Sequence, residues 1–91
     1  MTELDVTIRN RAGIHARPSA LIAQTAVGFG SRIWLEKAGN RINAKSIMGI
    51  ITLGAGFGTL IRIIADGPDE AAAVTAIKAL FDSGFNEELG Q

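Results

Sequence analysis

The chain has 91 residues, with nine Lys and Arg against nine Asp and Glu, a net charge of zero and no cysteine. A chain of this length encloses one modest core, so we predict a single domain over residues 1–91. The balanced charge excludes a field that would attract nucleic acid or an anionic membrane, and the lack of cysteine excludes disulfides and thiolate metal sites. No apolar run reaches the roughly 18 residues that span a bilayer, and the polar first residues do not resemble a signal peptide. We therefore expect a cytoplasmic protein.

The first half of the chain predicts a strand, a helix and a hairpin. Residues 4–9 alternate apolar and polar side chains, the pattern of a strand with one buried face. Apolar residues recur at helical spacing over 16–27, which predicts a helix. Alternation returns over 31–37, and a glycine–asparagine turn then leads to a short strand over 41–43.

The second half predicts a short helix, a strand and a longer helix. Residues 47–53 suit a short helix in which Ile50 and Leu53 point inward. Residues 60–65 alternate again and predict the last strand. Proline and two acids then open a helix that presents one apolar stripe and ends at Gly84.

This order of strand, helix, strand, strand, helix, strand, helix predicts an α+β domain of two layers. Each strand shows one apolar side, so the helices must all cover the same face of the sheet. We expect Trp34, Leu60 and Ile64 to be scattered apolar side chains on the open face.

The single histidine, His15, directly precedes the first predicted helix. A phosphoryl group attached there would meet the free N–H groups and the positive end of the helix dipole. Arg17 adds a fork of donors suited to phosphate oxygens, and Pro18 favours the first helical turn. A neutral imidazole is nucleophilic near neutral pH, so His15 is a candidate phosphoryl acceptor.

Other roles for His15 are open on the residues alone. It could cap the helix or lie exposed without function. A hydrolytic dyad or triad is less favoured, because no cysteine and no paired acid motif accompanies it. A metal site is also disfavoured, because no second histidine is present.

Ser46 directly precedes the short predicted helix, where serine is an ordinary N-cap. A phosphate on this hydroxyl would also meet helix N–H donors, so regulation by phosphorylation is physically open, with Lys45 as a nearby countercharge. An outward apolar patch follows, which suits either partner docking or ordinary core. It consists of Ile47, Met48 and Ile51.

Two motifs carry a resemblance to a known family: Gly-Ile-His-Ala-Arg-Pro at 13–18 and Asn-Ala-Lys-Ser-Ile-Met-Gly at 43–49. They resemble the motifs of HPr, the histidine-containing phosphocarrier of the bacterial phosphoenolpyruvate:sugar phosphotransferase system. The element order and length agree over essentially the whole chain. The resemblance implies an open-faced β-sandwich, a four-stranded antiparallel sheet with three helices on one face (βαββαβα).

The same resemblance implies that His15 receives phosphate from enzyme I and delivers it to sugar-specific enzyme IIA domains, with Arg17 stabilising the phosphate. Ser46 resembles the serine phosphorylated by HPr kinase/phosphorylase. A transcriptional regulator is a further implied partner, although Ile51 replaces a methionine found in relatives that act with one. The residues expected to contact partners are Ala16, Ala20, Ile47, Met48 and Ile51.

We expect a monomer with no cofactor and no metal, which turns nothing over without its partner enzymes. Two functions follow from the sequence. The first is a phosphocarrier that acts through His15. The second is a purely regulatory module that acts through phosphorylation of Ser46, without sugar transport.

Overall fold

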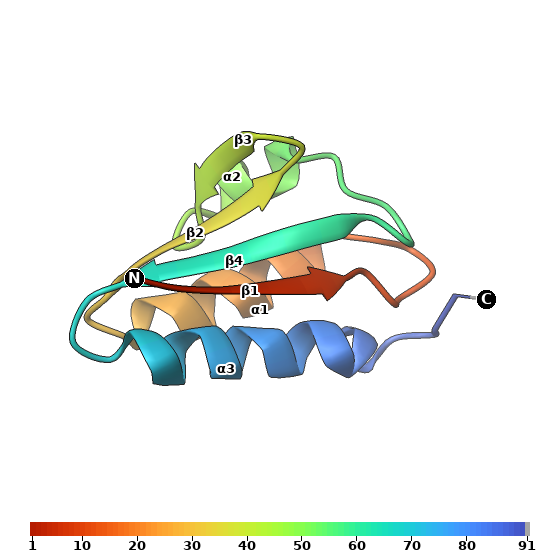
Figure 1. The fold of residues 1–91 in the computed structure, drawn as a ribbon. Helices are drawn as coiled ribbons and strands as arrows, with labels where there is room; N and C mark the ends of the chain where they lie inside the picture. Colours follow the sequence, from red (N-terminus) through yellow and green to blue (C-terminus); the bar gives the residue numbers. More distant parts are fainter. Residues whose placement is uncertain (91) are drawn as a thin grey trace.

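The computed structural model describes residues 1–90, which fold in the order β1–α1–β2–β3–α2–β4–α3, followed by the 3₁₀ turn η1 (Figure 1). The strands are β1 (Thr2–Thr7), β2 (Arg32–Lys37), β3 (Asn40–Asn43) and β4 (Leu60–Asp66). The helices are α1 (Ala16–Val27), α2 (Ile47–Thr52) and α3 (Glu70–Asp82), and η1 covers Gly84–Asn86. The predicted order of strands and helices is confirmed.

The sheet has the strand order β1-β4-β2-β3, and every pair of neighbouring strands is antiparallel. The two longer helices, α1 and α3, lie side by side under one face of the sheet, while α2 packs against α1 and β3 (Figure 1). Within residues 1–90, the other face carries no helix (Figure 1). This is the open-faced, two-layer α+β sandwich that the sequence predicts.

The core lies between the sheet and the helices, and the alternation of each strand decides which side chains enter it. Ile61 and Ile63 of β4 are fully buried, as are Ile33 and Leu35 of β2. From α3, Ile77 packs into the same core. Ile50 of the short helix α2 and Leu53, its C-cap, are buried as predicted.

The prediction for the open face is wrong at one residue. Leu60 is exposed, but Ile64 has none of its side chain accessible, although it lies outside the main core. Its cross-strand neighbours are Trp34 on β2 and Glu3 on β1. Because opposed residues on neighbouring strands lie close together, these two long side chains shield Ile64 from water.

The helix α3 stops near Gly84 as predicted, and the segment after it folds back on the domain. Gly84 takes a positive φ of 62° and ends the helix, and the next residue, Phe85, is fully buried with its ring 5.0 Å from that of Phe81. The chain then runs beside the loop after β1, where Arg11 N donates to Glu88 O at 2.8 Å. This return brings the C-terminal segment to the start of α1.

In residues 1–90, none of the helices combines the length and apolar character that crossing a membrane requires.

Candidate functional site

His15 occupies the N-cap position of α1, yet its ring does not cap the helix. Its backbone is extended, with φ −120° and ψ −162°, and the side chain forms no capping hydrogen bond. Its carbonyl accepts the first hydrogen bond of the helix, from Ser19 N at 3.0 Å, and a second from Ser19 Oγ at 2.7 Å. The imidazole is 45% exposed, so it remains free to act at the surface.

The loop ahead of His15 is held by a close backbone approach at Gly13. A Cβ atom on Gly13 would lie 2.8 Å from Ala55 O and from Gly56 Cα, and the residue has a φ of +73°. The next residue, Ile14, donates its N–H to Ala55 O at 2.9 Å. Only glycine meets both demands without strain, and the two loops together position the start of α1.

Glu87, in the C-terminal segment, contacts the ring of His15. Its carboxylate oxygens lie 3.1 and 3.0 Å from His15 Nε2. Oε1 also accepts a hydrogen bond from Asn10 Nδ2 at 3.0 Å, and Oε2 accepts one from Arg17 Nη1 at 3.0 Å. One carboxylate therefore joins three side chains of the segment 10–17, from which it is 70 to 77 positions distant in sequence.

Arg17 is anchored at one end of its guanidinium. Besides the bond to Glu87, its Nη1 donates to Phe85 O at 2.7 Å. Because a guanidinium carries five N–H donors, the donors on Nε and Nη2 remain for a further ligand. The structure thus brings the predicted pair, His15 and Arg17, together at the start of α1.

The environment of Glu87 keeps it ionised. Burial of the carboxyl acts to raise the pKa of Glu87, but the hydrogen bonds from His15, Asn10 and Arg17 outweigh it and lower the pKa below its usual value. A negative carboxylate therefore lies against the imidazole of His15 at neutral pH.

Asn10 supports this arrangement from a buried position. It has no accessible surface, and its Nδ2 also donates to Gly13 O at 2.7 Å. Its Oδ1 is buried and has no partner among the described residues. The side chain therefore links the loop after β1 to Glu87.

Ser46 is the N-cap of α2, as predicted, because its side chain accepts a hydrogen bond from Gly49 N at 3.0 Å. Lys45 is not a free countercharge: its Nζ donates to Phe29 O, beyond the C-terminal end of α1, at 2.9 Å. The hydroxyl is half-buried and separate from the network around His15.

An exposed apolar surface lies beside these two positions. Ala16 is exposed and Ala20 half-buried on α1, which packs against α2. The outward residues of α2 are exposed by 42%, 69% and 37%, in the order Ile47, Met48, Ile51. Thus the patch suggested by the sequence is a surface and not a part of the core.

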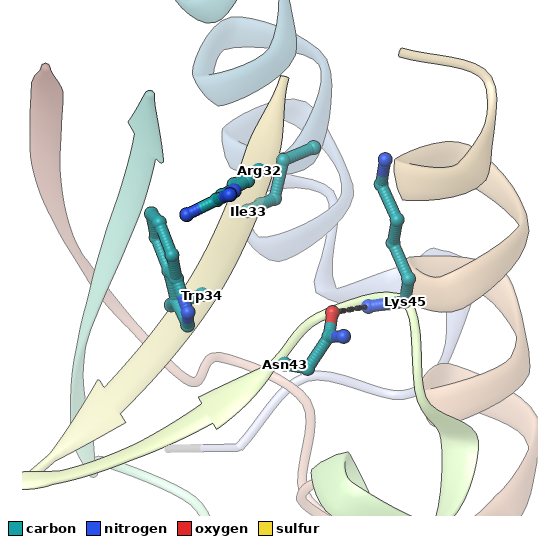
Figure 2. Close-up of a pocket in the computed structure, with 5 residues that line it drawn as sticks. All are labelled: Arg32, Ile33, Trp34, Asn43 and Lys45. Atoms are coloured by element: carbon teal, nitrogen blue, oxygen red, sulfur yellow. Dashed lines mark hydrogen bonds between the residues drawn. The ribbon is translucent and has the colours of Figure 1, made fainter. Parts of the chain in front are cut away.

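A separate shallow pocket of about 230 Å³ opens at the β2–β3 edge. Figure 2 shows Arg32 and Trp34 on β2 and Asn43 at the end of β3, with Asn43 Oδ1 accepting a hydrogen bond from Lys45 N at 2.8 Å. None of the residues predicted for phosphoryl transfer lines this pocket.

The sequence reasoning missed Glu87 and Asn10. No periodicity marks them, because both lie outside strands and helices and act only after the chain has folded back. The one available signal is Phe85, a large apolar residue beyond the predicted helix stop, which indicates that the tail packs on the domain.

Comparison with known proteins agrees with this architecture. The family model described as the PTS HPr component phosphorylation site matches residues 2–83. The Phosphocarrier protein HPr of Treponema pallidum is 51% identical over 83 residues, covering 91% of this chain and 94% of that protein. A crystal structure of HPr from Thermoanaerobacter tengcongensis superposes with a TM-score of 0.93 at 48% identity, covering 98% of this chain and 100% of the other.

A second structure from the same organism is described as an HPr dimer; it is 47% identical with a TM-score of 0.76 and covers 96% of this chain and all of that one. Together the fold and the histidine at the start of α1 define the class of small phosphocarrier proteins. The chain belongs to the HPr family, the HPr component of the phosphotransferase system. Glu87 lies beyond the residues that the family model matches.

Proposed function

We propose that this protein is a phosphocarrier that accepts a phosphoryl group on His15 and passes it to a second protein. The observation that carries the proposal is the exposed imidazole at the start of α1, with the anchored guanidinium of Arg17 beside it. The first turn of α1 holds no acidic residue, so its free N–H groups and positive dipole end favour an anion.

The partners in this proposal are enzyme I as donor and enzyme IIA domains as acceptors. Both must reach the imidazole, and the surface around it suits them because it is apolar and exposed. The proposed docking residues are Ala16, Ala20, Ile47, Met48 and Ile51. The flexible Met48 among them suits a surface that contacts several partners in turn. The donor and acceptor enzymes supply the alignment for transfer, so the chain alone is not an enzyme.

Ser46 is the proposed regulatory site, phosphorylated by HPr kinase/phosphorylase. Its hydroxyl already faces the first turn of α2 through the bond to Gly49 N. A phosphate there would add about −1.5 to −2 charges directly beside Ile47 and Met48. We expect this charge to change which partners the docking surface accepts, a transcriptional regulator among them.

The proposal also describes a cytoplasmic, one-domain monomer. Its oligomeric state is measured by light scattering after size-exclusion chromatography at several concentrations. A mass of one chain throughout supports the monomer, whereas a mass of two chains assigns this protein the dimeric state described for the relative.

Incubation with enzyme I and phosphoenolpyruvate, followed by intact-mass measurement, tests the carrier function. We expect the mass of one phosphoryl group, lost in acid as a phosphohistidine is, and no such gain in the His15→Ala variant. Absence of label on the wild-type protein in the presence of active enzyme I contradicts the carrier function.

A parallel incubation with HPr kinase and ATP tests Ser46. We expect an acid-stable label that is absent from Ser46→Ala. Acid-stable label without any acid-labile label would favour the purely regulatory module, and no label from the kinase would remove Ser46 from the proposal.

A further inference from the structure

Within residues 1–90, only Nε2 of the His15 ring has a hydrogen-bond partner, and that partner is Glu87. Its carboxylate lies 3.0 and 3.1 Å from Nε2, and the side chain is only 18% exposed. An ionised carboxylate only accepts hydrogen bonds. The neutral imidazole therefore carries its proton on Nε2, and the lone pair of the ring is on Nδ1.

We propose that Glu87 is a positioning residue for phosphoryl transfer, which fixes the Nε2–H form of His15 and so directs Nδ1 at the phosphorus. This inference rests on the proposed function. The same carboxylate anchors Arg17 Nη1 at 3.0 Å and is itself held by Asn10 Nδ2 at 3.0 Å. The carboxylate thus holds the imidazole of His15 and the guanidinium of Arg17 in fixed positions relative to each other.

The transfer step is balanced without moving a proton on this chain. With a phosphohistidine donor, the Nδ1 lone pair forms the new N–P bond as the donor's N–P bond breaks. The donor leaves as a neutral imidazole, and the positive charge of its ring passes to the ring of His15, which keeps its proton on Nε2. Glu87 lies beside that new charge and stabilises it, as a buried carboxylate does for a catalytic histidine in hydrolases.

Backbone and apolar contacts of the folded tail hold Glu87 in position. Phe85 is fully buried against Phe81, and Glu87 N donates to Gly84 O at 3.0 Å. These contacts hold the tail without the Glu87 side chain. Consequently, the Glu87→Gln substitution, which keeps the size and removes the charge, is expected to leave the fold intact.

The first experiment measures the tautomer of His15 directly. Long-range ¹H–¹⁵N spectra are recorded on ¹⁵N-labelled protein well above the midpoint of the ring's titration. We expect the wild-type ring to be almost wholly in the Nε2–H form. In Glu87→Gln we expect a smaller fraction of the Nε2–H form, because an amide can donate as well as accept.

The matched control is Glu88→Gln, which removes only an exposed ion pair with Arg11. A wild-type ring in the Nδ1–H form overturns the proposal whatever the variants do.

The second experiment measures the rate of phosphorylation with phosphoramidate, a small donor that needs no partner protein, and again with enzyme I. We expect Glu87→Gln to be about tenfold to a hundredfold slower with both donors, the range found when a metal-ligating histidine loses the carboxylate that orients it. Glu88→Gln should match the wild type.

The two donors separate this inference from the proposed function. A loss confined to enzyme I, with an unchanged tautomer, makes Glu87 a docking contact and overturns the inference. If enzyme I labels nothing, while phosphoramidate still shows the difference between wild type and Glu87→Gln, the carrier function fails and the role of Glu87 stands.

Discussion

His15 and Glu87 are 72 positions apart in sequence, yet their side chains meet at 3.0 Å. At the scale of single residues, the site depends on two kinds of position. Chemical groups such as the imidazole of His15 supply the reactivity. Backbone positions such as Gly13 supply the geometry, because they let two loops approach more closely than any side chain would allow.

The Gly13→Ala substitution tests the close backbone approach at Gly13. Gly13 and Gly39 both have positive φ, +73° and +83°, but only Gly13 has neighbouring atoms in the place of a Cβ. We expect Gly39→Ala to destabilise the protein by about 1 kcal/mol through left-handed strain alone. Gly13→Ala should cost roughly 1–3 kcal/mol more, because the new methyl meets the backbone of Ala55 and Gly56.

Urea unfolding of both variants measures the difference, and phosphorylation of His15 reports whether the loop has moved. Equal losses of stability in the two variants would show that the close approach at Gly13 contributes nothing.

At the scale of elements, the short helix α2 depends on its cap. Six residues are too few for a helix that is stable alone, so α2 depends on burial of Ile50 and Leu53 and on the Ser46 side chain. The same hydroxyl is the proposed phosphorylation site. Its two roles are therefore linked, since modification changes the group that caps the helix.

The Ser46→Ala substitution is expected to lower the free energy of unfolding by about 0.5–2 kcal/mol, because Gly49 N loses its acceptor. Ser83→Ala is the control: that exposed hydroxyl donates to Leu80 O at the end of α3. We expect a change within about 0.5 kcal/mol there. Denaturant midpoints compare the two, and a Ser46→Ala variant as stable as the wild type would contradict the capping role.

At the scale of the whole molecule, α3 joins the start of the chain to its end. Glu70, in its first turn, accepts a hydrogen bond from the Thr2 hydroxyl and lies 2.9 Å from the N-terminal amine. The last turn of α3 leads into Phe85 and the tail that reaches His15. The helix therefore contacts the first strand at one end and leads at the other into the turn that follows it (Figure 1).

This arrangement predicts an acid-sensitive stability. The hydrogen bond from Thr2, with those from the N-terminal amine and Gly67 N, lowers the pKa of Glu70 from 4.5 to about 2. Because the folded pKa is the lower one, Glu70 contributes stability above pH 4.5 that is lost as the pH falls toward 2. The lowered pKa of Glu87 acts in the same direction.

Thermal unfolding between pH 7 and pH 2 measures this effect. We expect the stability of Glu70→Gln to fall less steeply over that window than the stability of the wild type. Thr2→Val, which removes only one donor, should be intermediate. Parallel curves for Glu70→Gln and the wild type would exclude Glu70 as a source of the acid sensitivity.

The sequence by itself determined the elements, the one-sided sheet and the candidate acceptor. Period-2 and helical patterns decide which face of each segment is buried, and they are local properties. The position of His15 ahead of a helix is equally local. The helical pattern of α2 also placed Ile50 and Met48 on different faces, but the exposure of Met48 came from the structure.

Only the tertiary structure decided what surrounds the histidine and what covers the open face. Ile64 is buried because Trp34 and Glu3 oppose it across two strand pairs, which alternation within β4 cannot reveal. Glu87 reaches His15 because Phe85 anchors an irregular tail in the core. Both outcomes depend on contacts between distant segments, and a residue outside periodic structure carries no local signal of the partner it will meet.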